Sequence, residues 1–102
     1  MTVTQVFKAL GDPIRLKIVK RLSDGSDYTI GNLSENLGIT RQGARKQIQV
    51  LVSADVVQLK PNGREIRVIL NPSKLERARQ FISKLEDQWD QRLKALKEFA
   101  EE

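Results

Sequence analysis

The chain has 102 residues, 39% of them hydrophobic and 30% charged, and it contains neither cysteine nor histidine. This is the length of one domain with a modest core, and the lack of cysteine excludes disulfides and thiol redox sensing. The formal charge is +5, no apolar run approaches the roughly 18 residues of a membrane span, and no signal-peptide pattern is present, so we expect a cytoplasmic protein.

Two short helices are predicted at the start of the chain. The first, Val3–Leu10, is amphipathic and has Val6 and Phe7 among its apolar positions. Asp12 followed by proline is typical of a helix start, because aspartate accepts hydrogen bonds from free backbone N–H groups and proline suits the first helical position. The second helix is therefore predicted from Pro13 to about Leu22.

A helix-turn-helix is predicted next. Tyr28–Ile30 is either a short edge strand or a lead-in to a helix capped by Thr29, and the first helix of the motif is expected over about Ile30–Leu37. Gly38 is the predicted turn residue, because glycine readily adopts the positive φ that follows many helices. Ile39 is expected to fill the core.

The second helix of the motif has two distinct faces. Ala44, Ile48 and Leu51 follow the i, i+4, i+7 spacing of a buried face. The opposite face is basic and rich in amides, which is the composition expected of a helix that enters a DNA groove, although a solvated helix face has the same appearance. The predicted DNA-binding residues here, with Thr40 also capping the helix, are Thr40, Arg41, Gln42, Arg45, Lys46 and Gln49. Gly43 either permits a close backbone approach to DNA or to the first helix, or has no role.

A β-hairpin is predicted after the motif. Val56–Lys60 and Glu65–Leu70 are rich in strand-forming residues, and the Asn-Gly pair within Pro61–Arg64 is a hairpin turn signal. The hairpin is either purely structural or a wing that contacts phosphate or the minor groove. The predicted wing contacts are Lys60, Asn62, Arg64 and Arg67.

A long helix is predicted from about Ser73 to near the end of the chain. Its apolar residues recur every seven positions, a pattern typical of packing against another helix. The other helix is either in a second copy of the chain or absent, in which case the seam covers the domain's own core. Trp89 on this seam could instead line an effector pocket. The predicted dimer-interface residues are Val6, Phe7, Leu75, Ile82, Leu85, Trp89, Leu96 and Phe99.

The charge is unevenly divided along the chain. Residues 1–71 hold 11 Lys/Arg and 6 Asp/Glu, whereas residues 72–102 hold 7 of each. The whole excess therefore lies in the segment that contains the helix-turn-helix. A polyanionic partner explains this, and so does a basic surface that keeps the protein soluble.

The residues needed for most catalysis are absent. Without histidine or cysteine, the chain lacks the usual general base and the most effective nucleophile, and it has no glycine-rich phosphate loop. We therefore predict a protein that is not an enzyme and has no cofactor. Glu86, Asp87 and Asp90 are typical of a polar helix surface rather than a cation site, so no metal is predicted.

The order of these features resembles the ArsR/SmtB family of winged-helix repressors. The resemblance covers nearly the whole chain: FKALGDPIR over residues 7–15, LSENLGITRQ over 33–42, the VVQLK…GREIRVILNP hairpin and the long terminal helix. It implies a homodimer that binds operator DNA near its own gene and releases it when an effector binds. It also implies that Arg41, Gln42, Arg45, Lys46 and the Lys60–Arg64 hairpin face DNA.

The chain departs from the family in one respect. Metal sensors of the family use cysteines, histidines and carboxylates, so the absence of Cys and His excludes Zn²⁺, Cu⁺ or arsenite sensing of the usual kind. The effector is not identified by the sequence, and neither is the choice between repressor and activator.

The sequence thus predicts a mainly α protein with a small β-hairpin wing. Residues 1–71 are expected to form a winged helix-turn-helix and residues 72–102 a C-terminal dimerisation helix within the same compact domain. The predicted function is sequence-specific, double-stranded DNA binding by a homodimeric regulator. The alternatives are a winged-helix protein-interaction module and a nonspecific nucleic-acid-binding protein.

Overall fold

The computed structural model describes residues 2–101. Residue 1 of the predicted segment 1–71 and residue 102 of the predicted segment 72–102 lie outside the described part. The elements in chain order are α1 (Val3–Leu10), α2 (Pro13–Leu22), β1 (Tyr28–Thr29), α3 (Ile30–Leu33), α4 (Arg41–Ser53), β2 (Val57–Asn62), β3 (Glu65–Leu70) and α5 (Pro72–Glu101). The prediction of a mainly helical chain with one hairpin is confirmed.

Local capping signals account for the helix starts. The Asp12 carboxylate accepts hydrogen bonds from the backbone N–H groups of Ile14 at 2.9 Å and Arg15 at 3.0 Å, so α2 begins where predicted. Thr29 has both roles that the sequence left open. It ends the two-residue strand β1, and its hydroxyl accepts from the Asn32 N–H at 3.1 Å as the N-cap of α3.

The first helix of the helix-turn-helix is shorter than predicted. It ends at Leu33 rather than Leu37, because Asn36 adopts a left-handed φ of 58° and Gly38 one of 77°. Leu37 still lies in the core, with 1% of its surface exposed. The prediction that Ile39 fills the core is wrong, since 39% of its surface is exposed at the turn.

The three strands form one antiparallel sheet in the order β1-β3-β2. The hairpin is longer and tighter than the sequence indicated, because β2 continues through Pro61 to Asn62, which pairs with Glu65. Gly63 and Arg64 alone make the turn, and Gly63 has a φ of 65°, as the first central position of a primed hairpin turn requires. The wing therefore presents Arg64 at its tip.

The core lies between α1, α2, α3, α4 and the inner face of the sheet. Its most buried large side chains are Val6, Ile18, Leu33, Leu37, Leu51, Val56 and Val57. Val6 is 1% exposed within a single chain, so its prediction as a dimer-interface residue is wrong: the core of its own protomer already covers it.

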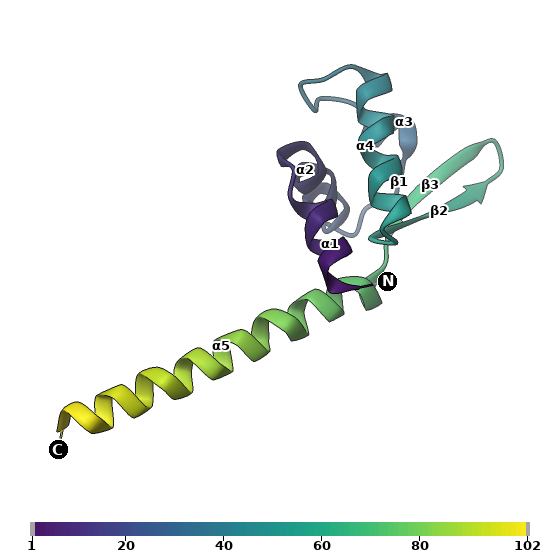
Figure 1. The fold of residues 1–102 in the computed structure, drawn as a ribbon. Helices are drawn as coiled ribbons and strands as arrows, with labels where there is room; N and C mark the ends of the chain where they lie inside the picture. Colours follow the sequence, from purple (N-terminus) through teal and green to yellow (C-terminus); the bar gives the residue numbers. More distant parts are fainter. Residues whose placement is uncertain (1, 102) are drawn as a thin grey trace.

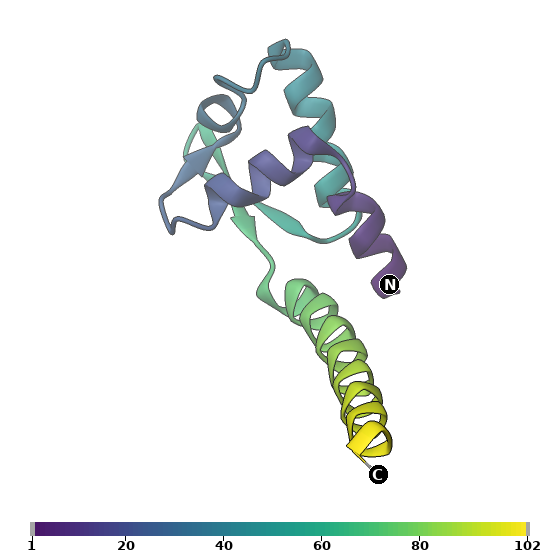
Figure 2. The same ribbon diagram turned by 90° about the vertical axis from the view of Figure 1, so that its left-hand side faces the viewer.

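Helix α5 extends away from this body. Its first turns pack against α1, where Ala78 is buried and the rings of Phe7 and Phe81 meet edge to face with centroids 5.7 Å apart. From Phe81 onward, every described residue of α5 is exposed. Figures 1 and 2 show the helix as an arm that leaves the body on the side away from the wing, which gives the molecule a length of 68 Å against 26 and 23 Å in the other directions.

Candidate nucleic-acid interface

Helix α4 has the two faces that its sequence predicted. Ala44, Ile48 and Leu51 are at most 2% exposed and anchor the helix in the core. The Thr40 hydroxyl accepts a hydrogen bond from the Gly43 N–H at 3.0 Å, which caps the helix as expected. The opposite face is solvent-exposed and includes Arg41, Gln42, Arg45, Lys46 and Gln49.

Gly43 has its nearest neighbours in the turn before α4. A Cβ atom on Gly43 would meet the Thr40 hydroxyl at 3.2 Å and the Ile39 Cδ1 at 3.6 Å. The glycine therefore makes room for the capping hydroxyl. Of the two readings that the sequence left open, neither included this contact.

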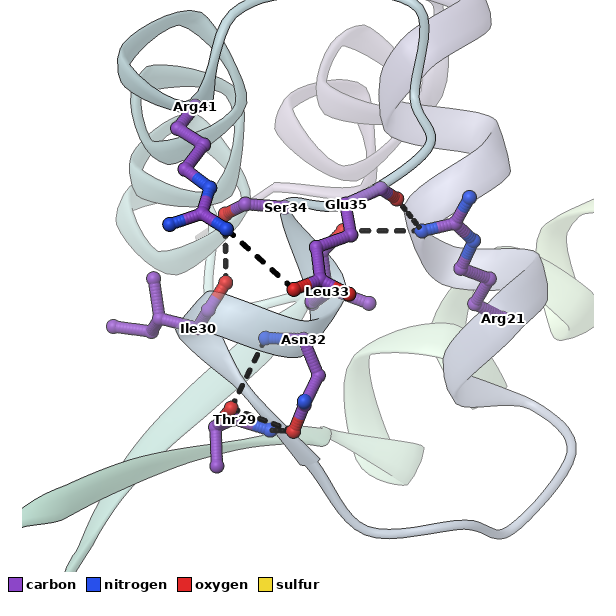
Figure 3. A network of polar contacts seen from close by, with 8 residues as sticks. All are labelled: Arg21, Thr29, Ile30, Asn32, Leu33, Ser34, Glu35 and Arg41. Atoms are coloured by element: carbon purple, nitrogen blue, oxygen red, sulfur yellow. Dashed lines mark hydrogen bonds and ion pairs between the residues drawn. The ribbon is translucent and has the colours of Figure 1, made fainter.

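Arg21 of α2 holds the turn between α3 and α4. Its guanidinium donates hydrogen bonds to the backbone carbonyls of Leu33 at 3.2 Å and Glu35 at 2.5 Å (Figure 3). It also donates to the backbone carbonyl of Asn36 at 2.8 Å. Leu33 ends the short helix α3, and Glu35 and Asn36 lie in the turn after it, so these carbonyls lack intrahelical N–H donors. Sequence reasoning missed Arg21, because no local pattern connects it to a turn 12 to 15 residues later.

Glu35 of the same turn faces the start of α4. Its carboxylate lies 3.6 Å from the Arg41 guanidinium, and the two side chains are 53% and 75% exposed (Figure 3). An ion pair this open to solvent stabilises the fold by less than about 1 kcal/mol. Arg41 therefore remains available to an anionic partner that competes with Glu35.

The predicted wing residues have different surroundings. Lys60, Asn62 and Arg64 are exposed, whereas Arg67 is half-buried on the central strand β3. Arg67 donates to the Asp27 carboxylate at 2.7 Å. In the amide orientation that places the Asn62 oxygen toward Arg67, this oxygen accepts from Nη2 at 2.8 Å and from Nε at 2.9 Å. Arg67 thus links the wing to the segment before β1.

A groove of about 540 Å³ separates α4 from the wing. Arg45 and Gln49 border it from α4, Arg64 and Glu65 border it from the hairpin, and the start of α3 also lines it. Three residues predicted to contact DNA, two on α4 and one on the hairpin, therefore face one shared space. The combination of guanidinium and amide donors suits phosphate oxygens and base edges.

The second predicted surface is the apolar stripe of α5. Among the predicted interface residues, Phe7 and Leu75 are half-buried against the core of their own chain. The stripe itself comprises seven exposed large apolar side chains: Phe81, Ile82, Leu85, Trp89, Leu93, Leu96 and Phe99. The sequence missed Phe81 and Leu93 because both lie outside the two strict seven-residue columns, although they fall on the same broad face of a 3.6-residue helix.

Comparisons with known proteins agree with this arrangement. A model described as a helix-turn-helix domain matches residues 10–59. The transcriptional repressor SdpR of Bacillus subtilis is 32% identical over 74 residues, covering 72% of this chain and 81% of that protein. An ArsR-like transcriptional regulator from Rhodococcus sp. RHA1 superposes with a TM-score of 0.79 at 30% identity, over 96% of this chain and 92% of that one.

A further similar structure is described as homodimeric. It is a winged helix-turn-helix DNA-binding domain of Mycobacterium bovis, a possible ArsR-family regulator, which superposes with a TM-score of 0.65 at 21% identity. The match covers 84% of this chain and 79% of that one. At this identity the similarity shows a shared fold.

The capped basic helix, the turn before it and the hairpin beside it define a winged helix-turn-helix DNA-binding protein. The similarity to SdpR and to the Rhodococcus regulator shows that the chain belongs to the ArsR family of transcriptional regulators. Among the described helices, none is long and apolar enough to cross a membrane. Within residues 2–101, no group of three or more acidic side chains is arranged to hold a metal ion.

Proposed function

We propose that the protein is a homodimeric transcriptional repressor that binds an inverted-repeat operator through α4 and the wing. The groove between these elements carries the proposal, because Arg45, Gln49 and Arg64 converge on it from two parts of the fold. Helix α4 would enter the major groove by its N-terminal part, and the hairpin would lie along the adjacent backbone.

The proposed contacts are the exposed polar residues of these two elements. Arg67 has a separate role in this proposal, because Asp27 and Asn62 already occupy its guanidinium. We assign it the task of orienting Asn62 and the wing. The proposed DNA-contacting set is Thr40, Arg41, Gln42, Arg45, Lys46, Gln49, Lys60, Asn62 and Arg64.

A second copy of the chain is the proposed occupant of the α5 stripe. Exposed apolar residues are usually scattered singly, whereas seven large apolar side chains lie together on one exposed face of α5. Such a patch is typical of an interface. The Mycobacterium bovis domain with the same fold is homodimeric, which supports this choice. Two-fold symmetry then requires an inverted repeat with half-sites about 10 base pairs apart.

Selection from a random double-stranded DNA library, followed by fluorescence anisotropy on the selected site and a scrambled control, tests the proposal. Arg45→Ala and Lys46→Ala are each expected to weaken operator binding by about 10-fold or more, with thermal stability unchanged. Lys17→Ala, an exposed lysine on α2, is the matched control. Affinity should also fall steeply with salt, with a slope near 0.9 for each phosphate contacted.

Two outcomes would overturn the proposal. Equal binding to selected and scrambled DNA would indicate a nonspecific nucleic-acid-binding protein. No binding at low salt would favour a winged-helix module that binds another protein.

A further inference from the structure

Arg15 joins the recognition helix to the helix that supports α5. Its Nε donates to the Ala9 carbonyl at 2.5 Å and its Nη2 to the Lys8 carbonyl at 3.3 Å, both in the last turn of α1. Its Nη1 donates to the Gln47 amide oxygen of α4 at 2.6 Å. One side chain of α2 therefore bridges two other helices.

The chemistry of this bridge favours a fixed geometry. The Ala9 carbonyl lies in the last turn of α1, where carbonyls lack intrahelical donors, so the guanidinium satisfies an acceptor that the helix leaves open. The Lys8 carbonyl is shared, because it also accepts from the Gly11 N–H at 3.2 Å. Guanidinium is planar and donates in several fixed directions, which lets it span two partners at once. The three acceptors in these bonds are uncharged, so the bridge depends on the geometry of the hydrogen bonds and not on an ion pair.

The bridge continues to the proposed dimer helix. Helix α1 contacts α5 through the edge-to-face pair of Phe7 and Phe81, 5.7 Å between centroids, and Ala78 of α5 is buried beside it. On its other side, α4 exposes Arg45 and Lys46, which immediately precede the bonded Gln47 in the same turn. A continuous set of contacts thus runs from α5 through α1 and Arg15 to the DNA-facing helix.

We propose that Arg15 and Gln47 are positioning residues that fix the angle of α4 relative to α5, and thereby set the operator half-site spacing that the dimer accepts. The inference rests on the proposed function, because only a dimer has two recognition helices whose separation matters. Neither residue contacts DNA in this proposal. Their effect is transmitted by holding α4 against α1.

The first test measures the geometry directly and needs no DNA. The chain has no cysteine, so Lys46→Cys on α4 and Gln80→Cys on α5, both exposed, give two unique spin-label sites. Doubly labelled protein diluted into excess unlabelled protein reports the distance within one chain, whether or not it dimerises. Arg15→Ala and Gln47→Ala should each broaden or shift the distance distribution, whereas the control Lys17→Ala should not.

The second test measures the functional consequence. Operators with one or two base pairs added or removed between half-sites are compared with the selected operator by anisotropy. Arg15→Ala is expected to bind the correct operator about 10-fold more weakly and to lose most of the discrimination against altered spacing. The double variant Arg15→Ala/Gln47→Ala should match Arg15→Ala within about 2-fold, because coupled residues are not additive.

The conservative variant Arg15→Lys separates the effect of hydrogen-bond geometry from the effect of charge. Arg15→Lys keeps the charge but cannot span both helices, so it should restore neither the narrow distance distribution nor the spacing preference. Full restoration by lysine would overturn the bridging role. Unchanged distances in Gln47→Ala, which leaves the bonds to α1 intact, would overturn it as well.

The two tests also separate this inference from the proposed function. A wild-type protein that selects no DNA defeats the proposed function and, with it, the assignment of half-site spacing. The spin-label distances then still decide whether Arg15 positions α4. Wild-type spacing preference in an Arg15→Ala protein whose only change is a lower Tm would reduce Arg15 to a purely structural residue.

Discussion

Replacing Trp89 tests whether a second copy of the chain covers α5. Trp89 is 59% exposed in the single chain, near the middle of the stripe. Complete burial of a large apolar side chain contributes up to about 3 kcal/mol, so covering the exposed part contributes about 1.5–2 kcal/mol. A symmetric interface contains two copies, so Trp89→Ala should weaken the dimer by about 3–4 kcal/mol, or roughly 100- to 1000-fold in the dimer Kd.

Sedimentation equilibrium over a range of concentrations measures that Kd. Detection in the far ultraviolet is needed because the variant removes the only tryptophan of the chain. Gln91→Ala, an exposed residue two positions along the same helix, is the matched control and should leave the Kd unchanged. A Trp89→Ala Kd within about 3-fold of the wild-type value would refute the reasoning, because it would mean that Trp89 stays in solvent.

Three further predictions concern the turn and the segment before the sheet. Arg21→Ala should lower the free energy of unfolding by about 2 kcal/mol in urea titrations, because a cation that donates to three carbonyls is lost. A decrease of less than about 0.5 kcal/mol would contradict the role of Arg21 in holding the turn between α3 and α4. Glu35→Gln should change Tm little but raise DNA affinity roughly 2- to 5-fold at low salt, since it removes a negative charge beside Arg41. Weaker DNA binding by this variant would contradict the idea that Glu35 competes with DNA for Arg41. The hydrogen bond from Tyr28 holds the pKa of the Asp24 carboxyl below its ordinary value, so Tyr28→Phe should raise that pKa in a carbon-13 NMR titration. Because the pKa of Asp24 is lower in the folded than in the unfolded state, its hydrogen bond with Tyr28 stabilises the fold above about pH 4, and this stabilisation is lost as the pH falls through the lowered pKa. An unchanged Asp24 pKa in Tyr28→Phe would show that the Tyr28 hydrogen bond does not cause the shift.

The sequence predicted the features that depend on residues close together in the chain. Asp12 and Thr40 cap their helices through partners two or three residues away, and Gly38 turns where glycine was expected. The inward and outward faces of α4 follow from helical spacing alone. Such signals are local, so a single sequence carries them in full.

The errors arose where distant residues decide the outcome. Helix α3 ends early in a turn held by Arg21, which no helical period can reveal. The DNA contact of Arg67 stays a prediction, but its partner is also distant, because the Asp27 carboxylate that accepts from its guanidinium lies 40 residues earlier. The apolar spacing of α1 correctly marked Val6 as buried but could not say which chain buries it.

On the proposed function, the α5 stripe and the Arg15 bridge serve one requirement. A single winged helix contacts few phosphates, and its affinity for one half-site is correspondingly weak. Joining two such units makes the second contact intramolecular, but the gain is lost when the two recognition helices do not match the half-site spacing. Dimerisation through α5 therefore improves operator binding only as far as α4 is held in a fixed relation to α5, and Arg15 provides bonds that hold it.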